Sequence, residues 1–191
     1  MKLLYFKEHL SCINYQINVN TGFVYYNLEK DSVSKIDNSA SPCILFLLDG
    51  EVSIDSGEYQ NVHIEKDKMV LIPQHVDNKI EVTYDAKCLL LFWNKDIRVC
   101  DKVYMNSLSS YKERKKEMCV LPIRDPLQAV LNSIVAYLYA KMQCKHMHLI
   151  KQQEVLLVLR GYYTKKELFT FFSSILGNTC LLYTSPSPRD R

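Results

Sequence analysis

The chain has 191 residues, of which 48% are hydrophobic and 24% charged, and its formal net charge is +3. These values are those of an ordinary globular protein that buries roughly 70% of its unfolded surface. A charge this small does not by itself indicate a nucleic-acid surface. No apolar run approaches the length of a membrane span, so no membrane association is expected.

Seven cysteines are spread through the chain without any Cys-x-x-Cys pair. Because their number is odd and no zinc-type spacing occurs, neither a disulfide framework nor a zinc site is expected. The better interpretation is a set of buried, reduced thiols in a cytoplasmic protein.

The first half of the chain has the alternation and the β-branched and aromatic content of short strands. Strands are expected at 3–6, 11–17, 22–28, 43–48, 51–55, 69–72, 79–84 and 88–93, with a polar loop at 31–41. Asp49-Gly50 is a hairpin turn signal between two of them. This spacing predicts a small antiparallel barrel or double sheet, whose interior is either a core or a pocket.

A polar segment at 95–118 follows the last strand and contains a basic cluster at 112–116. A nucleic-acid contact and a solvated connector are the two interpretations of this cluster. Glutamates interrupt the basic residues, which favours the connector.

The rest of the chain has helical periodicity. Asp125 followed by Pro126 is expected to cap a first helix, with proline at the first helical position. Apolar residues between Leu127 and Met142 then recur on one helical face.

Two further helices are expected after the first. One runs over 148–161 and is ended by Gly161. The other is opened by a capping box formed by Thr164 and Glu167, and stops at Gly177. Strands first and helices second is the order of an α+β protein.

Few residues in the sequence are candidates for catalysis or for binding a metal or cofactor. A metal site inside a barrel needs two or three histidines and a carboxylate, but His146 and His148, the His-x-His pair, lie in the helical part. There is no Gly-x-Ser-x-Gly motif and no glycine-rich phosphate loop. We therefore expect no metal, no cofactor and no enzymatic activity.

Three residues are candidates for contact with a small molecule in the barrel. Trp93 ends an apolar strand and is placed to stack on a ligand at the barrel mouth, with a core tryptophan as the alternative. His75 follows Pro73 at a strand end, as a residue of the rim or the pocket. Tyr25 is the third candidate, because it and Tyr26 point to opposite strand faces and one of them is expected to line the interior.

The helical part carries apolar faces that are wider than one barrel covers. Candidate dimer-interface residues are Leu149, Leu156, Phe171 and Phe172. A self-contained helical layer on the sheet is the alternative interpretation of the same pattern.

Two segments of the sequence are distinctive together. The helical segment contains His148-Leu149-Ile150-Lys151, Leu159-Arg160 and Tyr162-Tyr163-Thr164, and the strand segment contains Asp49-Gly50-Glu51-Val52 and Val70-Leu71-Ile72-Pro73-Gln74-His75. The first resembles the linking helices of AraC-type bacterial transcription regulators, of the kind seen in Bacteroides-like bacteria. The second is similar to the cupin-like sensing barrel that these regulators carry at the N-terminus. The resemblance covers residues 10–177.

The resemblance implies a cupin-like sensing barrel at 1–121 and a helical linking and dimerisation region at 122–178. It also implies a small-molecule effector, a homodimer, and DNA contact only through a C-terminal helix-turn-helix domain. Residues 179–191 read as the translation of a sequencing adapter and are expected not to be native. The chain is therefore expected to be a truncated fragment without its DNA-binding domain.

Two alternatives to a regulator fragment stay open at this point. One is a small cupin-fold, metal-dependent enzyme. The other is a purely structural dimerisation module with a filled barrel.

Overall fold

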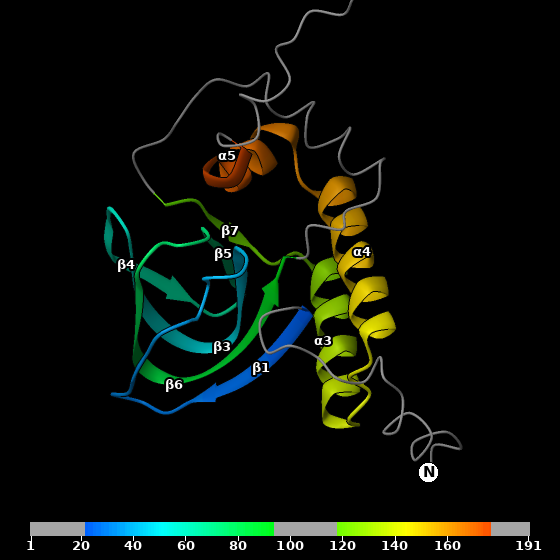
Figure 1. Ribbon diagram of the computed structural model, residues 1–191, viewed down its shortest axis with the longest axis horizontal. Coiled ribbons are helices and arrows are strands. Elements are labelled where there is room, and N and C mark those ends of the chain that lie inside the picture. The colour runs from blue at the N-terminus through cyan, green and yellow to red at the C-terminus, as the bar shows by residue number, and fades with distance from the viewer. Residues whose placement is uncertain (1–21, 94–117, 177–191) are drawn as a thin grey trace, which may run out of the picture.

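The computed structural model describes residues 22–93 and 118–176. The strands expected at 3–6 and 11–17, the basic cluster at 112–116 and the tail at 179–191 lie outside the described residues. In the described residues, the strands precede the helices along the chain, and strands and helices occupy separate parts of the molecule (Figure 1). The α+β class and the order of barrel followed by three helices are confirmed.

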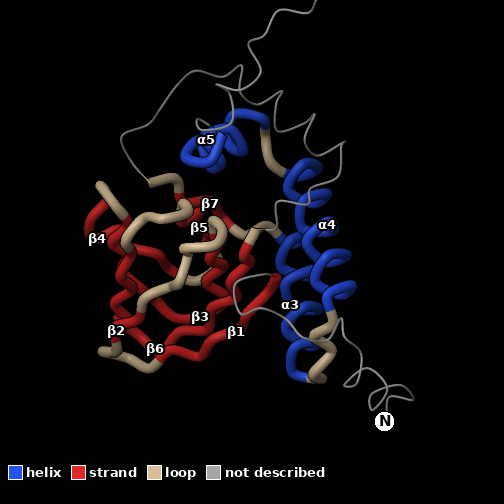
Figure 2. Tube along the Cα trace, viewed as in Figure 1, coloured by secondary structure: helices blue, strands red, loops and turns tan. Residues whose placement is uncertain are grey.

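One antiparallel sheet forms the barrel (Figure 2). Its strands are β1 (Gly22–Leu28), β2 (Val33–Ser34), β3 (Cys43–Ser56), β4 (Tyr59–Glu65), β5 (Lys68–Ile72), β6 (Asn78–Phe92) and β7 (Val120–Pro122). The order is β1-β6-β3-β5-β7, with β2 paired to β6 and β4 paired to β3. The two longest strands, β3 and β6, therefore lie next to each other at the centre.

The Asp49-Gly50 hairpin expected from the sequence is wrong, because β3 continues through this dipeptide. Gly50 has a φ of +84°, and the pairing of β3 with β6 shifts register around it. Such a bulge bends a strand without ending it. The two strands expected at 79–84 and 88–93 are likewise one strand, β6, and Trp93 lies just beyond its end. The loop expected at 31–41 contains the short strand β2.

Both faces of the central strands are buried over 43–47 of β3 and 88–92 of β6. In β3, Cys43, Leu45 and Leu47 belong to the apolar cluster inside the barrel. Ile44 and Phe46 alternate with them and belong to the cluster between the sheet and the helices. A strand covered on both sides has a continuous apolar sequence, which explains the unbroken run at 43–48.

Three helices follow β7. They are α3 (Asp125–Tyr139), α4 (Lys145–Tyr162) and α5 (Lys165–Leu176). The predicted capping box is confirmed, since the Glu167 amide donates to Thr164 Oγ1 at 3.2 Å and the Thr164 amide donates to Glu167 Oε2 at 2.7 Å. The predicted Asp125 cap is wrong: Arg124 is the N-cap residue, no side chain caps the helix, and Asp125 is its first residue.

The helices cover one side and one end of the barrel. Helices α3 and α4 pack side by side, and both contact β1, whereas α5 lies against β5 and β7 (Figure 1). Within the described ranges, none of the helices has the length and apolar character needed to cross a membrane. The face of β1 that is turned away from the barrel interior is therefore the main junction between strands and helices.

Gly50→Ala is expected to destabilise the fold by about 1–3 kcal/mol or more, because the residue needs a left-handed backbone conformation. An added Cβ would also lie 2.2 Å from the Asp85 carbonyl oxygen. Gly161→Ala is the matched control, since nothing lies within 4 Å of the added atom there. It should be neutral or stabilising by up to about 1 kcal/mol. Urea unfolding of both variants measures the difference, and equal losses would contradict this account of the bulge.

Candidate functional site

A cavity of about 150 Å³ lies inside the barrel, between β1, β3, β6 and the segment around β2. Its buried lining consists of aliphatic, aromatic and thiol side chains: Ile36, Leu45, Ile80, Cys88, Leu90 and Phe92. Its volume is comparable to that of an apolar cavity that holds benzene. The barrel interior is therefore part core and part pocket.

The polar residues of the cavity lie at its rim. Ser34, Lys35 and Asp37 are exposed or half-exposed there. Lys35 Nζ is 3.1 Å from Asp77 Oδ1, and Asp37 Oδ1 accepts hydrogen bonds from the amide and hydroxyl of Ser39 at 3.1 Å and 2.6 Å. The two rim charges are opposite in sign and each already has a partner. The mouth of the cavity is consequently polar without a strong field of one sign.

Cys88 is the one cavity residue with a chemically reactive group deep in the wall. It lies opposite Tyr26 of β1 and Leu47 of β3 in the strand register. Burial raises the pKa of its thiol to about 12, so the thiol is protonated at neutral pH. A protonated thiol is neither a nucleophile nor a metal ligand.

Within residues 22–93 and 118–176, no group of three or more His, Cys, Asp or Glu side chains is placed to share a metal ion. At the cavity, this part of the chain presents an apolar wall and a polar mouth. The expectation that the protein uses no metal stays a prediction.

The three ligand-contact residues predicted from the sequence lie in three different places. Trp93 is buried outside the barrel interior, with its ring centroid 5.5 Å from that of Phe172 in α5. His75 is exposed in the turn between β5 and β6, with a φ of +61°. Tyr25 faces α3, where its ring centroid is 5.4 Å from that of Tyr139. None of the three lines this cavity, and their contact with a ligand stays a prediction.

The aromatic residue at the cavity mouth is instead Tyr26, the neighbour of Tyr25. Strand alternation showed that these two tyrosines face opposite ways. It did not show which face is the interior, because the partner strands are apolar on both sides. The register of Tyr26 with Cys88 settles the matter.

The predicted dimer-interface residues are largely covered within one copy of the chain. Leu156, Phe171 and Phe172 are buried in the cluster between helices and sheet, and Leu149 is half-buried. The buried three have little surface left to offer a second copy. Their part in dimerisation stays a prediction.

His148 connects helix α4 to the first residues of β1. The Phe23 amide donates a hydrogen bond of 2.9 Å to His148 Nδ1, and the two rings stack with their centroids 6.1 Å apart. Gly22 makes this approach feasible, since a Cβ there would lie 2.6 Å from Nδ1. Burial lowers the pKa of His148 to about 4, so the ring is neutral and accepts this bond at neutral pH.

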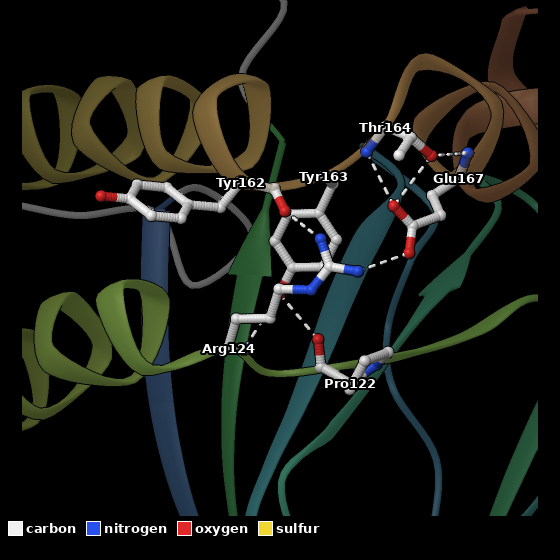
Figure 3. Close-up of polar contacts among 6 residues, drawn as sticks. All are labelled: Pro122, Arg124, Tyr162, Tyr163, Thr164 and Glu167. Carbon is white, nitrogen blue, oxygen red and sulfur yellow. Dashed lines mark hydrogen bonds and ion pairs between the residues drawn. The ribbon is translucent and has the colours of Figure 1, made fainter.

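A second connection joins the end of β7 to the junction between α4 and α5 (Figure 3). The Arg124 guanidinium lies 4.3 Å from the ring centroid of Tyr163, 2.6 Å from Glu167 Oε1, and donates to the Tyr162 carbonyl. The Tyr163 hydroxyl accepts from the Arg124 amide at 3.1 Å and donates to the Pro122 carbonyl at 2.7 Å. Charge-assisted bonds of this kind fix the direction in which α5 leaves α4.

No protein-family model and no curated protein matches this chain. Among solved structures, a cupin-2 domain protein from Shewanella frigidimarina is 16% identical, with a TM-score of 0.32 over 39% of this chain and 72% of that one. An RmlC-like cupin with a double-stranded β-helix fold from Methanocaldococcus jannaschii is 14% identical, with a TM-score of 0.34 over 39% and 71%. Oxalate decarboxylase from Bacillus subtilis is 9% identical, with a TM-score of 0.35 over 48% and 29%. The first two are described as cupins, the type of barrel expected from the sequence, but similarities this low indicate nothing about activity.

Cys88→Leu should stabilise the protein by about 0.5–2 kcal/mol, because the larger apolar side chain enters existing free volume. Cys43→Leu is the matched control: Cys43 is an equally buried barrel thiol that does not line the cavity. There the same change overpacks the core and should cost about 1–3 kcal/mol. Thermal unfolding under reducing conditions measures both, and a loss of stability in Cys88→Leu would contradict the assigned cavity.

Acidification should weaken the attachment of α4 in a defined pH range. The native state holds His148 neutral down to about pH 4, whereas the unfolded chain takes up its proton near pH 6.5. The contribution of His148 to the free energy of unfolding is therefore full above about pH 6.5. It falls as the pH drops from there to about pH 4, by at most about 3 kcal/mol. His148→Asn keeps an acceptor near the Phe23 amide without titrating, so its stability should change less across this range. Urea unfolding at a series of pH values tests this, and parallel profiles for the two proteins would refute it.

Proposed function

We propose that this chain is the ligand-sensing and dimerisation portion of an AraC-type transcription regulator and performs no chemistry of its own. The observation that supports this most directly is the position of β1. This strand lines the cavity with one face and carries both helices α3 and α4 on the other.

The contacts of β1 alternate along the four residues from Phe23 to Tyr26. Tyr26 stands at the cavity mouth, while its neighbour Tyr25 packs on α3 and Phe23 is bonded to His148 of α4. A ligand that shifts Tyr26 or the backbone of β1 therefore acts on the helix contacts through adjacent residues of the same strand. Because interiors are close-packed, such a shift is transmitted to the neighbouring side chains.

A second route leads from the cavity to α5. Leu45 of the cavity wall is paired with Val70 of β5, and Val70 is paired with Val120 of β7. Two residues further along, Pro122 accepts the hydrogen bond of the Tyr163 hydroxyl. The barrel is thus joined to the helices at two points, one near each end of α4.

The binding free energy available to a small ligand is large enough to drive a conformational switch. Moving a two-state equilibrium from 1:99 to 99:1 requires about 5.5 kcal/mol of differential binding free energy. A ligand of six to nine non-hydrogen atoms is limited to about 1.5 kcal/mol per atom, or roughly 9–13 kcal/mol in all. A ligand small enough for this cavity can therefore drive the transition if it binds one state selectively.

Dimerisation is proposed to use the outer face of α4. Ile150 and Leu157 lie seven residues apart, on the same face of the helix, and are 63% and 67% exposed. Apolar side chains in this arrangement form the seam of a helix pair. DNA contact through a further C-terminal domain and a cytoplasmic location are parts of the same proposal.

Sedimentation of the full chain tests the dimer. The wild type should sediment as a dimer at tens of micromolar, and Leu157→Glu should become monomeric with an unchanged thermal midpoint, because its side chain is exposed. Leu156→Glu is the matched control on the adjacent, buried position: it should unfold the protein, since it buries an unpaired charge. A monomeric wild type, or a Leu157→Glu variant that stays dimeric, would overturn the proposed interface.

Stoichiometric iron, zinc or manganese in protein purified without chelator would instead favour an enzyme.

A further inference from the structure

We propose that the barrel cavity selects a small, neutral aromatic molecule with a single hydroxyl or N–H group, such as a phenol or an indole. This inference rests on the proposed sensing function and names the class of its ligand. It excludes sugars and free carboxylates from this site. Three features of the cavity support this inference: its wall, its mouth and its size.

The wall has no hydrogen-bonding group to offer. Its buried side chains are apolar apart from the Cys88 thiol. The backbone of the wall is also occupied, because β6 pairs on both sides: Leu90 pairs with Val24 of β1 and with Leu45 of β3. Each sugar hydroxyl placed against this wall would lose its water without gaining a partner. A polyhydroxylated ligand is therefore rejected by the wall itself.

The mouth can satisfy one polar group. Ser34 and Tyr26 bring hydroxyls to the rim, and each can donate or accept a hydrogen bond. Lys35 and Asp37 stand at the same rim with opposite charges, and Lys35 is already paired with Asp77. The rim thus offers no net counter-charge that would offset the loss of hydration of an anion or a cation, so a neutral ligand is favoured over both.

The size and shape favour one aromatic ring. The volume of about 150 Å³ suits a molecule about as large as benzene with one substituent or a fused small ring. Phe92 in the wall and Tyr26 at the mouth supply aromatic surfaces for edge or offset contacts with such a ring. With its ring in the wall and its hydroxyl or N–H at the mouth, the ligand satisfies every group that it buries.

Isothermal titration of the full chain with phenol, indole, toluene, benzoate, benzylamine and arabinose tests the class. Phenol and indole should bind at least about tenfold more tightly than benzoate or benzylamine, and arabinose should not bind. Cys88→Leu, which fills the cavity, should weaken phenol binding by about tenfold or more, whereas Cys43→Ala, away from the cavity, should leave it unchanged. The double variant Tyr26→Phe with Ser34→Ala should keep toluene binding and lose most of the preference for phenol over toluene.

Hydrogen exchange of α3 and α4 with and without phenol separates this inference from the proposed function. Phenol binding that leaves the helix amides unaffected would overturn sensing but retain the ligand class. Tighter binding of benzoate or arabinose than of phenol would overturn the class, and altered helix exchange with that ligand would retain sensing. Failure of both phenol and indole to bind would also overturn the class.

Discussion

The burial of both faces of β3 over 43–47 and of β6 over 88–92 is the constraint on which this structure depends. These adjacent strands form the wall of the barrel on one side and the floor of the helical layer on the other. Each apolar side chain that they contribute therefore belongs to one of two separate clusters. Burial of apolar surface contributes roughly 25 cal/mol per Å², so both faces of this strand pair stabilise the fold. Helices α3 and α4 lie against the neighbouring strand β1, and the outward-facing residues of β3 and β6 join the same apolar cluster.

Sharing one sheet between two cores has a consequence for function. A cavity in the inner cluster lies one strand thickness from the helix contacts of the outer cluster, as Tyr26 and Tyr25 illustrate on β1. The polar connections at His148 and Arg124 then fix the helices to that strand and to β7 by directional bonds. Apolar packing holds the helices on the sheet, and the hydrogen bonds define the angle at which the helices lie.

A β-barrel by itself specifies no chemistry, because metal and binding sites are added to the fold by its inward-facing side chains. Here the buried residues that line the cavity are aliphatic, aromatic or thiol, and the Cys88 thiol is kept protonated by burial. Such a wall favours the binding of apolar surface, because contact with it removes that surface from water.

The sequence by itself determined the elements whose signals are local. The capping box at Thr164 and Glu167, the apolar face of α3, the run at 69–72 and the order of strands before helices all follow from spacing and from capping chemistry. Only the tertiary structure decided which face of each strand is the interior, and so whether Tyr25 or Tyr26 meets the cavity, because strands that are apolar on both sides carry no sign of direction. It also decided that Gly50 bends a long strand where a turn was expected, since a glycine with positive φ serves a bulge and a hairpin equally well. The pairing of His148 with Phe23 joins residues 125 positions apart, and no local pattern encodes such a contact.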